Sequence, residues 1–375
     1  MDKKDKNPNV PNLRFPSFTN SYCVYTLGEV LQRVSNPVNI DENKLYYQIG
    51  IRSHSKGVFY KKAETGKQIG NKRIFWIESN CLILNIVFAW EQAVAKTSQK
   101  EIGRVASHRF PMYKVLNNSL DYIVDFFKTE KGRQVLQMAS PGGAGRNKTL
   151  NQKFFLSSKV YLPSLKEQLI ISRFITLIEN RIETQIKIID AYSSFIKAIS
   201  NTLIGCKKEN IEIGRCLDCY SSNIKEKDLE LITSGNYPVY GANGCIKKIS
   251  KYNISGSSIA IIKDGANVGK ITKLNGKYSI LSTMNYLTAK QGYDLNYLYY
   301  SLKQKSLKKY VVGSGIPHIY FKDYKQEKIY IPHDRFLIAN ITSLLTNIDE
   351  MIQIETKKLD KYKSQKQYLL KNMFI

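Results

Sequence analysis

One short segment has the residue types of a phosphate-binding loop but not their spacing. Such a loop needs the pattern G-x-x-x-x-G-K-[ST], in which backbone N–H groups hold the phosphates and the hydroxyl binds Mg²⁺. Here Gly265-Ala-Asn-Val-Gly269-Lys270 is one residue short, and Ile271 stands where the hydroxyl belongs. We therefore predict a turn between two strands, with Gly269 at positive φ and with Asn267 and Lys270 projecting from the loop tip.

The cysteines provide at most half of a zinc site. Cys216 and Cys219 have the C-x-x-C spacing, but Cys206 and Cys245 are single and no paired histidines follow. A structural zinc ion needs four ligands, which usually come as two such pairs. We therefore predict that the chain binds no metal.

Residue combinations typical of covalent catalysis are missing. The G-x-S-x-G, H-E-x-x-H and protein-kinase motifs do not occur. There is also no Pro-Pro dipeptide, and therefore no Asn/Asp-Pro-Pro-aromatic motif of the kind that amino-methyltransferases use. The four histidines are scattered along the chain: His54, His108, His318 and His333. We predict a non-enzymatic chain without catalytic residues.

The charge balance points to a polyanionic partner. The 375 residues include 57 Lys+Arg against 31 Asp+Glu, which leaves a net charge of +26. A single basic cluster is more often a solvated face, but a surplus of this size favours a surface that binds nucleic acid. The clusters occur in both halves of the chain: 71–73, 108–109, 146–148, 247–248, Lys263 with Lys270, and 308–309.

Cysteine usage and hydropathy indicate the compartment. Six cysteines are too sparse and irregular for a disulfide scaffold, so we expect reduced thiols. The N-terminus has no apolar core of a signal peptide, and no apolar run approaches the ~18 residues that a spanning helix needs. We expect a cytoplasmic protein without a membrane partner.

An internal repeat organises the elements that must position these side chains. Two segments, beginning at Val160 and Ile329, each open with an apolar-Tyr-apolar-Pro tetrapeptide and later carry D-x-Y-x-S. In each segment the apolar residues recur every three or four positions, which predicts a long amphipathic helix. Ser164 to Glu167 has the pattern of a capping box at the start of the first helix, and Gly205 is a plausible end.

The length of these helices favours pairing between them. About 40 residues at 1.5 Å each make a rod of roughly 60 Å, longer than a small domain is wide. Each helix could instead pack only on its neighbouring globular domain, as shorter helices do. We predict that the two apolar stripes bury each other as in a coiled coil.

The repeat extends to the globular parts. Leu27-Gly28 matches Ile213-Gly214, and 120–123 matches 295–298, each followed by an aromatic-rich helical stretch. Between them, β-branched runs such as 81–88 and 258–263 indicate strands. We predict five segments: an N-terminal tail (1–20), a first globular domain (21–162), a long helix (163–205), a second globular domain (206–331) and a second long helix (332–375). The predicted fold class is α+β, with two mixed α/β domains whose helices form an antiparallel coiled coil with pseudo-two-fold symmetry.

From about residue 20 to the C-terminus, the order and duplication of these features resemble the specificity (S) subunit of type I restriction–modification systems. The markers are the LRFP opening at 13–16, the apolar-Pro boundaries at Pro163 and Pro332, and the D-x-Y-x-S motifs. In the second half, 236–244, 261–269 and 282–285 resemble one class of target-recognition domain, and in the first half 85–91 resembles another.

The resemblance implies a targeting role. Each target-recognition domain would read one half of an interrupted double-stranded DNA site, and the helices would hold the halves at a fixed separation. The helices would also dock two methyltransferase subunits, and restriction subunits would complete the complex. This chain would hold no cofactor, because S-adenosylmethionine, ATP and Mg²⁺ would belong to the partner subunits.

Candidate contact residues are cations and amides expected on loops. Lys and Arg supply affinity for phosphates, and Arg, Asn and Gln can read base edges in the major groove. The DNA-binding candidates are Lys72, Arg73, Arg109, Arg146 and Lys148 in the first half, and Tyr240, Asn243, Lys263, Asn267, Lys270, Asn285 and His318 in the second.

Two other functions remain open from the sequence. One is the specificity component of a type IIG-like or stand-alone methylation system, against which the missing methyltransferase and nuclease motifs argue. The other is a non-enzymatic RNA-binding coiled-coil protein. An activity assay on the isolated chain would test the first, and competition between duplex DNA and single-stranded RNA would test the second.

Overall fold

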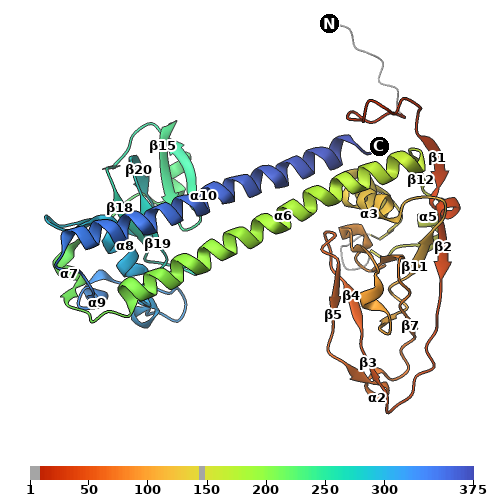
Figure 1. Cartoon of the computed structure of the whole chain (residues 1–375), viewed down its shortest axis with the longest axis horizontal. Helices are drawn as coiled ribbons and strands as arrows, with labels where there is room; N and C mark the ends of the chain where they lie inside the picture. Colours follow the sequence, from red (N-terminus) through yellow and green to blue (C-terminus); the bar gives the residue numbers. More distant parts are fainter. Residues whose placement is uncertain (1–8, 143–147) are drawn as a thin grey trace, which may run out of the picture. The chain divides into compact units, whose positions relative to one another are not determined.

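A computed structural model of the chain describes residues 9–142 and 148–375 (Figure 1). The described residues fall into two compact units. Unit 1 contains the residues up to Gln185 together with Lys358–Ile375, and unit 2 is Ile186–Lys357. The two long helices, α6 (Leu165–Ser200) and α10 (Arg335–Asn372), therefore contribute to both units.

Unit 1 is built on a four-stranded antiparallel sheet in the order β2-β11-β8-β9, accompanied by four two-stranded ladders, β1-β12, β10-β7, β3-β6 and β4-β5. Its strands are β1 (Cys23–Thr26), β2 (Leu31–Val34), β3 (Leu45–Tyr46), β4 (Ile49–Ile51), β5 (Val58–Tyr60), β6 (Glu64–Thr65), β7 (Ile74–Trp76), β8 (Leu82–Leu84), β9 (Val94–Lys96), β10 (Val105–Ser107), β11 (Met112–Val115) and β12 (Lys159–Leu162). Its shorter helices are α1 (Leu27–Val30), α2 (Gly66–Ile69), α3 (Leu120–Lys128), α4 (Glu130–Met138) and α5 (Gln152–Ser157), with 3₁₀ turns η1 (Ala89–Glu91) and η2 (Gln99–Glu101).

Unit 2 has two four-stranded sheets, ordered β14-β21-β18-β19 and β16-β15-β20-β17, and the ladder β13-β22. Its strands are β13 (Ile211–Glu212), β14 (Leu217–Ser221), β15 (Ser234–Gly241), β16 (Gly244–Ile249), β17 (Ile254–Ser255), β18 (Ser258–Ile262), β19 (Ile271–Leu274), β20 (Lys277–Ile280), β21 (Met284–Ala289) and β22 (Lys328–Ile329). Its shorter helices are α7 (Ile213–Cys216), α8 (Leu295–Lys303) and α9 (Phe321–Tyr324), with the π turn η4 (Asn201–Gly205) and the 3₁₀ turns η5 (Glu226–Glu230) and η6 (Leu307–Tyr310).

The repeat seen in the sequence is present in both units. In unit 1 the opening strand β1 pairs antiparallel with β12, the strand before α6, and in unit 2 β13 pairs antiparallel with β22, the strand before α10. A four-residue helix follows each opening strand, α1 in unit 1 and α7 in unit 2. Each globular part therefore closes on itself before its long helix begins.

The matched glycines of the repeat allow the same close approach in each unit. A Cβ on Gly28 would lie 3.3 Å from the carbonyl oxygen of Leu156, and a Cβ on Gly214 would lie 3.2 Å from Cβ of Lys325. Both distances are tight for a Cβ atom, so a larger residue at either position would have to displace its neighbour. The aromatic helices also correspond, since α3 and α8 each begin after a side chain that caps the first turn, Ser119 and Asp294.

In unit 1, the apolar stripe of α6 packs against the last turns of α10. Ile171, Ile175 and Ile178 share one hydrophobic core with Leu369 and Met373. Nearer the middle of both helices, the Arg181 guanidinium lies 5.3 Å from the centre of the Tyr362 ring. Residues later in α6 therefore contact residues earlier in α10, so the two helices pair antiparallel (Figure 1).

In unit 2, the remaining parts of the same helices share a second core. Ile196 of α6 is buried with Ile341, Leu345 and Ile348 of α10. The predicted pairing of the helices is thus confirmed within each unit. The apolar stripe of α6, with its spacing of three or four residues, includes Ile182, Ile186 and Ile189. Ile186 departs from the prediction, because its side chain is 41% exposed and the neighbouring Gln185 is buried.

The LRFP segment, which the sequence analysis placed in an N-terminal tail, packs on unit 1. Arg14 Nε and Nη2 each donate to one oxygen of the Glu167 carboxylate at 2.7 Å. The Glu167 side chain is only 1% exposed, and the Tyr22 hydroxyl donates to it at 3.3 Å. The predicted capping box at Ser164 is therefore only half formed: the Glu167 N–H donates to Ser164 Oγ, but the Glu167 carboxylate binds Arg14.

Loss of the Arg14 guanidinium should destabilise unit 1. Arg14→Ala leaves the Glu167 carboxylate buried without a counter-charge, so we expect the free energy of unfolding to fall by about 3 kcal/mol. Urea unfolding measures this change. The matched control is Arg133→Ala, whose ion pair with Glu130 lies on the exposed surface of α4 and should leave the midpoint unchanged. Equal shifts for both variants would contradict the prediction.

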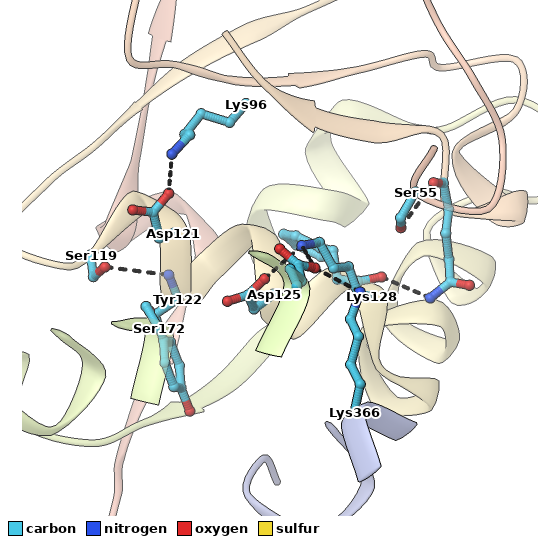
Figure 2. Close-up of polar contacts among 12 residues, drawn as sticks. Ser55, Lys96, Ser119, Asp121, Tyr122, Asp125, Lys128, Ser172 and Lys366 are labelled. Atoms are coloured by element: carbon cyan, nitrogen blue, oxygen red, sulfur yellow. Dashed lines mark hydrogen bonds and ion pairs between the residues drawn. The ribbon is translucent and has the colours of Figure 1, made fainter. Parts of the chain in front are cut away.

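A network of four charged side chains joins α3, α6 and α10 within unit 1. Figure 2 labels three of its members, Asp125, Lys128 and Lys366. The Lys128 ammonium contacts Asp125 at 2.8 Å and Glu179 at 2.9 Å, and Lys366 contacts Glu179 at 2.7 Å. Burial raises the pKa of Asp125 to about 6, although the Lys128 ammonium opposes this shift. Burial alone would raise the pKa of Glu179 too, but the Lys128 and Lys366 ammonium groups hold it below its ordinary value.

The Asp125 carboxyl should give unit 1 a characteristic pH dependence. An aspartate in the unfolded chain has a pKa of about 3.9. Between about pH 4 and pH 6 the folded state therefore binds more protons, and the contribution of Asp125 to stability falls as the pH rises. We expect Asp125→Asn, measured by urea unfolding, to gain roughly 2 to 3 kcal/mol relative to the parent between pH 4 and pH 7. Asp121→Asn, on the same helix but exposed, should show no such gain.

Candidate nucleic-acid interface

Backbone hydrogen bonds draw four loop segments of unit 1 together: 70–73, 85–90, 108–110 and 148–150, which we name the unit 1 loop set. The N–H of His108 donates to the carbonyl oxygen of Arg73 at 3.1 Å. The N–H of Ile86 donates to the carbonyl oxygen of Arg109 at 3.0 Å, and that of Leu150 to the carbonyl oxygen of Ile86 at 2.8 Å. Segments far apart in the sequence therefore meet at the residues predicted to bind DNA.

The cations of the unit 1 loop set are not neutralised by acidic side chains. Lys72, Arg73 and Arg109 are exposed, and Lys148 is half-buried with its Nζ 5.4 Å from the centre of the Trp90 ring. Among the residues that the structure describes, none of these four cations has an ion-pair partner. Such cations are available to phosphate groups. Arg146, also predicted as a contact, lies outside the described residues.

In unit 2, the phosphate-loop lookalike is the predicted hairpin. Strands β18 and β19 pair antiparallel, and the turn between them has Gly265 at φ 98° and Gly269 at φ 82°. The N–H of Lys270 donates to the carbonyl oxygen of Asn267 at 3.1 Å, which closes the turn. Asn267 and Lys270 are exposed at its tip. The prediction of a strand–turn–strand connection is confirmed.

Three further segments join this hairpin to form the unit 2 loop set: 240–244, 263–270, 281–283 and 312–319. The N–H of Leu281 donates to the carbonyl oxygen of Tyr240, and that of Lys263 to Thr283, at 2.9 and 3.0 Å. The N–H of Ile319 donates to the carbonyl oxygen of Lys263 at 2.9 Å. Six of the seven candidates of the second half lie on these segments.

The candidates of unit 2 differ in how their side chains are exposed. Asn243 is exposed at the turn between β15 and β16, and Lys263 and His318 are half-buried. Tyr240 packs edge-on against Tyr278 with ring centres 6.0 Å apart. Asn285 is only 7% exposed, and its Oδ1 accepts a hydrogen bond from Ser221 Oγ at 2.8 Å, so its predicted contact with DNA conflicts with its burial.

One side chain of the site was not among the candidates. The Asp264 carboxylate lies 2.8 Å from Nδ1 of His318, a residue 54 positions away in the sequence. Asp264 stands in the quoted segment 261–269, but nothing in its local pattern indicates this partner. Only the folded loops bring the two residues together.

The structure offers no metal centre in the part of the chain it describes. No group of three or more His, Cys, Asp or Glu side chains there could hold an ion. Burial raises the pKa of the Cys216 and Cys219 thiols to about 11. Among the described helices, none combines the length and the apolar character that crossing a membrane requires.

Comparison with known proteins finds a family match for the residues that carry the unit 2 loop set. Residues 209–363 match the family described as the type I restriction modification DNA specificity domain. The specificity subunit of the type I restriction enzyme MjaVIII from Methanocaldococcus jannaschii is 35% identical over 127 residues, which are 32% of this chain and 29% of that protein. This chain thus covers less than a third of the length of that relative.

Solved structures share the fold of the whole chain. The S subunit of the type I restriction–modification system from M. genitalium matches with a TM-score of 0.68 and 14% identity, over 98% of this chain and 99% of that one. A chain from work on complex assembly and conformational transition of the type I system matches with a TM-score of 0.54 and 14% identity, over 93% and 96%. These findings agree with the resemblance predicted from the sequence: residues 209–363 match the type I restriction modification DNA specificity domain, and the whole chain shares the fold of a solved type I specificity subunit.

Proposed function

We propose that this protein is the non-catalytic DNA-specificity subunit of a type I restriction–modification complex, and that it reads an interrupted site with one loop set for each half. The observation that carries the proposal is that, within each unit, lysines or arginines without an ion-pair partner among the described residues stand on loops that backbone hydrogen bonds hold together, joined in unit 2 by the exposed amides of Asn243 and Asn267. Cations of this kind supply affinity for phosphates, and neighbouring amides can read bases. The two loop sets differ in sequence, so the two half-sites should differ.

The long helices are proposed to set the gap between the half-sites. Helix α6 is continuous over 36 residues, of which the first belong to unit 1 and the last to unit 2. At 1.5 Å per residue it is about 54 Å long. Two readers on one helical element resemble the dimeric proteins whose geometry fixes the spacing of half-sites.

The outward faces of the helices are proposed to dock two methyltransferase subunits. Leu337, Leu344 and Met351 recur every seventh residue on α10, and Leu169 and Leu177 stand on α6. All five side chains are at least 40% exposed, although they are apolar. Apolar side chains that gather on a surface mark sites of protein contact. S-adenosylmethionine, ATP and Mg²⁺ would be bound by the methyltransferase and restriction subunits.

Substitutions in the loop sets should weaken binding to duplex DNA. We expect Arg73→Ala or Lys270→Ala to lower the affinity by roughly 1 to 3 kcal/mol if the side chain contacts a base, and by less, with a smaller salt dependence, if it contacts a phosphate. Titration of labelled duplex at two salt concentrations measures both. Unchanged affinity at both concentrations would reject the assignment.

The control for these substitutions is Asn285→Ala. Because Asn285 is buried and bonded to Ser221, its loss should lower the free energy of unfolding by about 1 kcal/mol and leave DNA affinity unchanged.

Competition between duplex DNA and single-stranded RNA tests which class of nucleic acid the protein binds. Preference for the RNA would contradict the proposal.

Lengthening both long helices should change the tolerated gap between half-sites. Four residues added to α6 and to α10 lengthen each helix by about 6 Å, close to two base pairs. We expect selection from duplexes with gaps of different length to recover a longer gap. Four residues inserted between Asn275 and Gly276, in the exposed turn between β19 and β20, should leave the gap unchanged. The same gap for both variants would argue against the proposal that the length of the helices sets the gap.

A further inference from the structure

The strongest unexplained feature of unit 2 is the pair of Asp264 and His318. Strand β18 ends at Ile262, and Asp264 is the second residue after it. His318 is the last residue of segment 312–318, which contains two glycines. The Asp264 carboxylate and Nδ1 of His318 are 2.8 Å apart, and the two side chains are 27% and 37% exposed. An acidic side chain in a surface proposed to bind DNA repels phosphates, so its position needs another reason.

The backbone around His318 is held firmly in place. His318 and Val312 exchange two hydrogen bonds, at 2.7 and 2.9 Å, and the N–H of Gly265 donates to the carbonyl oxygen of Pro317 at 2.9 Å. Gly313 has φ 93°, and a Cβ there would come within 2.6 Å of the carbonyl oxygen of Ile316. The next residue, Ile319, is buried in the core that also contains the long helices.

The imidazole ring of His318 has two neighbours besides its backbone. The ring is nearly parallel to the Tyr320 ring, with planes 20° apart and ring centres 6.4 Å apart, and the Lys322 ammonium lies 5.4 Å from the centre of the same Tyr320 ring. The Tyr320 ring lies alongside the imidazole, and the contact with Asp264 directs Nδ1 toward the carboxylate. Nε2 has no hydrogen bond to the described residues of the chain.

The chemistry of the pair decides what Nε2 can do. A carboxylate only accepts hydrogen bonds, so Nδ1 of His318 must carry the proton that joins them. In the neutral ring the other nitrogen then has a free lone pair and acts as an acceptor. In the major groove, adenine N6 and cytosine N4 are donors, whereas guanine and thymine present acceptors to such a position.

We propose that Asp264 is a positioning residue for base recognition: it holds His318 with Nε2 as an acceptor, and His318 thereby selects adenine or cytosine at one position of the half-site that unit 2 reads. This inference rests on the proposed function and adds to it a named reader and the class of base that it reads. Asp264 acts through His318 and does not itself contact DNA.

The test is selection of duplex DNA from a library with randomised half-sites, using the full chain at pH 8. We expect the parent protein to enrich an amino-bearing base at one position, and His318→Ala to lose about tenfold or more of the discrimination there only. Asp264→Asn should relax or reverse the same preference toward guanine or thymine, because an amide can also donate to Nδ1 and move the ring proton to Nε2.

A double substitution separates positioning from a merely structural role. In a His318→Ala background, Asp264→Asn should no longer change the preference, because no ring remains for residue 264 to orient. The matched control is Asp218→Asn, an exposed aspartate of β14 that pairs with Lys290 at 3.6 Å and should leave the selected sequence unaltered. Urea midpoints for all variants confirm that each remains folded.

The outcomes distinguish the two proposals. A parent protein that enriches a sequence while Asp264→Asn lowers affinity equally for all duplexes would overturn the role of Asp264 and leave the proposed function standing. A keto base at the position that His318→Ala affects would also overturn it. A parent protein that enriches no sequence at all would overturn the proposed function and this inference with it.

Discussion

The structure depends on one constraint: the apolar faces of two long helices have to be covered. A single helix of 36 or 38 residues with a continuous isoleucine and leucine stripe would expose that stripe to water. Each half of the stripe is instead buried in the core of one unit, with Ile175 and Leu369 in the first core and Ile196 and Leu345 in the second. The globular parts pack against the same cores, so the long helices stabilise these parts as well as connect them.

The loops that carry the proposed contacts are also anchored in these two cores. Surface loops are ordinarily the most variable part of a fold, yet here they exchange backbone hydrogen bonds with one another and run directly into buried residues such as Leu150 and Ile319. With a net charge of +26, the basic side chains repel one another. Because the loops lie at the surface, these side chains remain hydrated. The arrangement combines a rigid backbone with side chains that are free to meet a partner.

Much of this architecture could be predicted from the sequence because it is periodic or duplicated. The two helical stripes, the hairpin at Gly265 to Gly269 and the equivalence of α3 and α8 follow from patterns that are local or repeated. The LRFP segment could not be placed, because the contact of Arg14 with Glu167 joins residues 153 positions apart. Nor could the burial of Asn285, which depends on its register opposite Ser221 in the β14–β21 ladder. Register and long-range pairing are properties of the folded chain.

The stacking of Lys148 on Trp90 has a consequence for spectroscopy. The chain has two tryptophans, Trp76 in β7 and Trp90 in η1, and both belong to unit 1. Indole emission therefore reports on that unit without a signal from the other. Because the Lys148 ammonium lies over the Trp90 ring, a polyanion that draws the lysine away alters the field at the indole. The intrinsic fluorescence of the unlabelled protein can thus follow the binding of a polyanion at the unit 1 loop set.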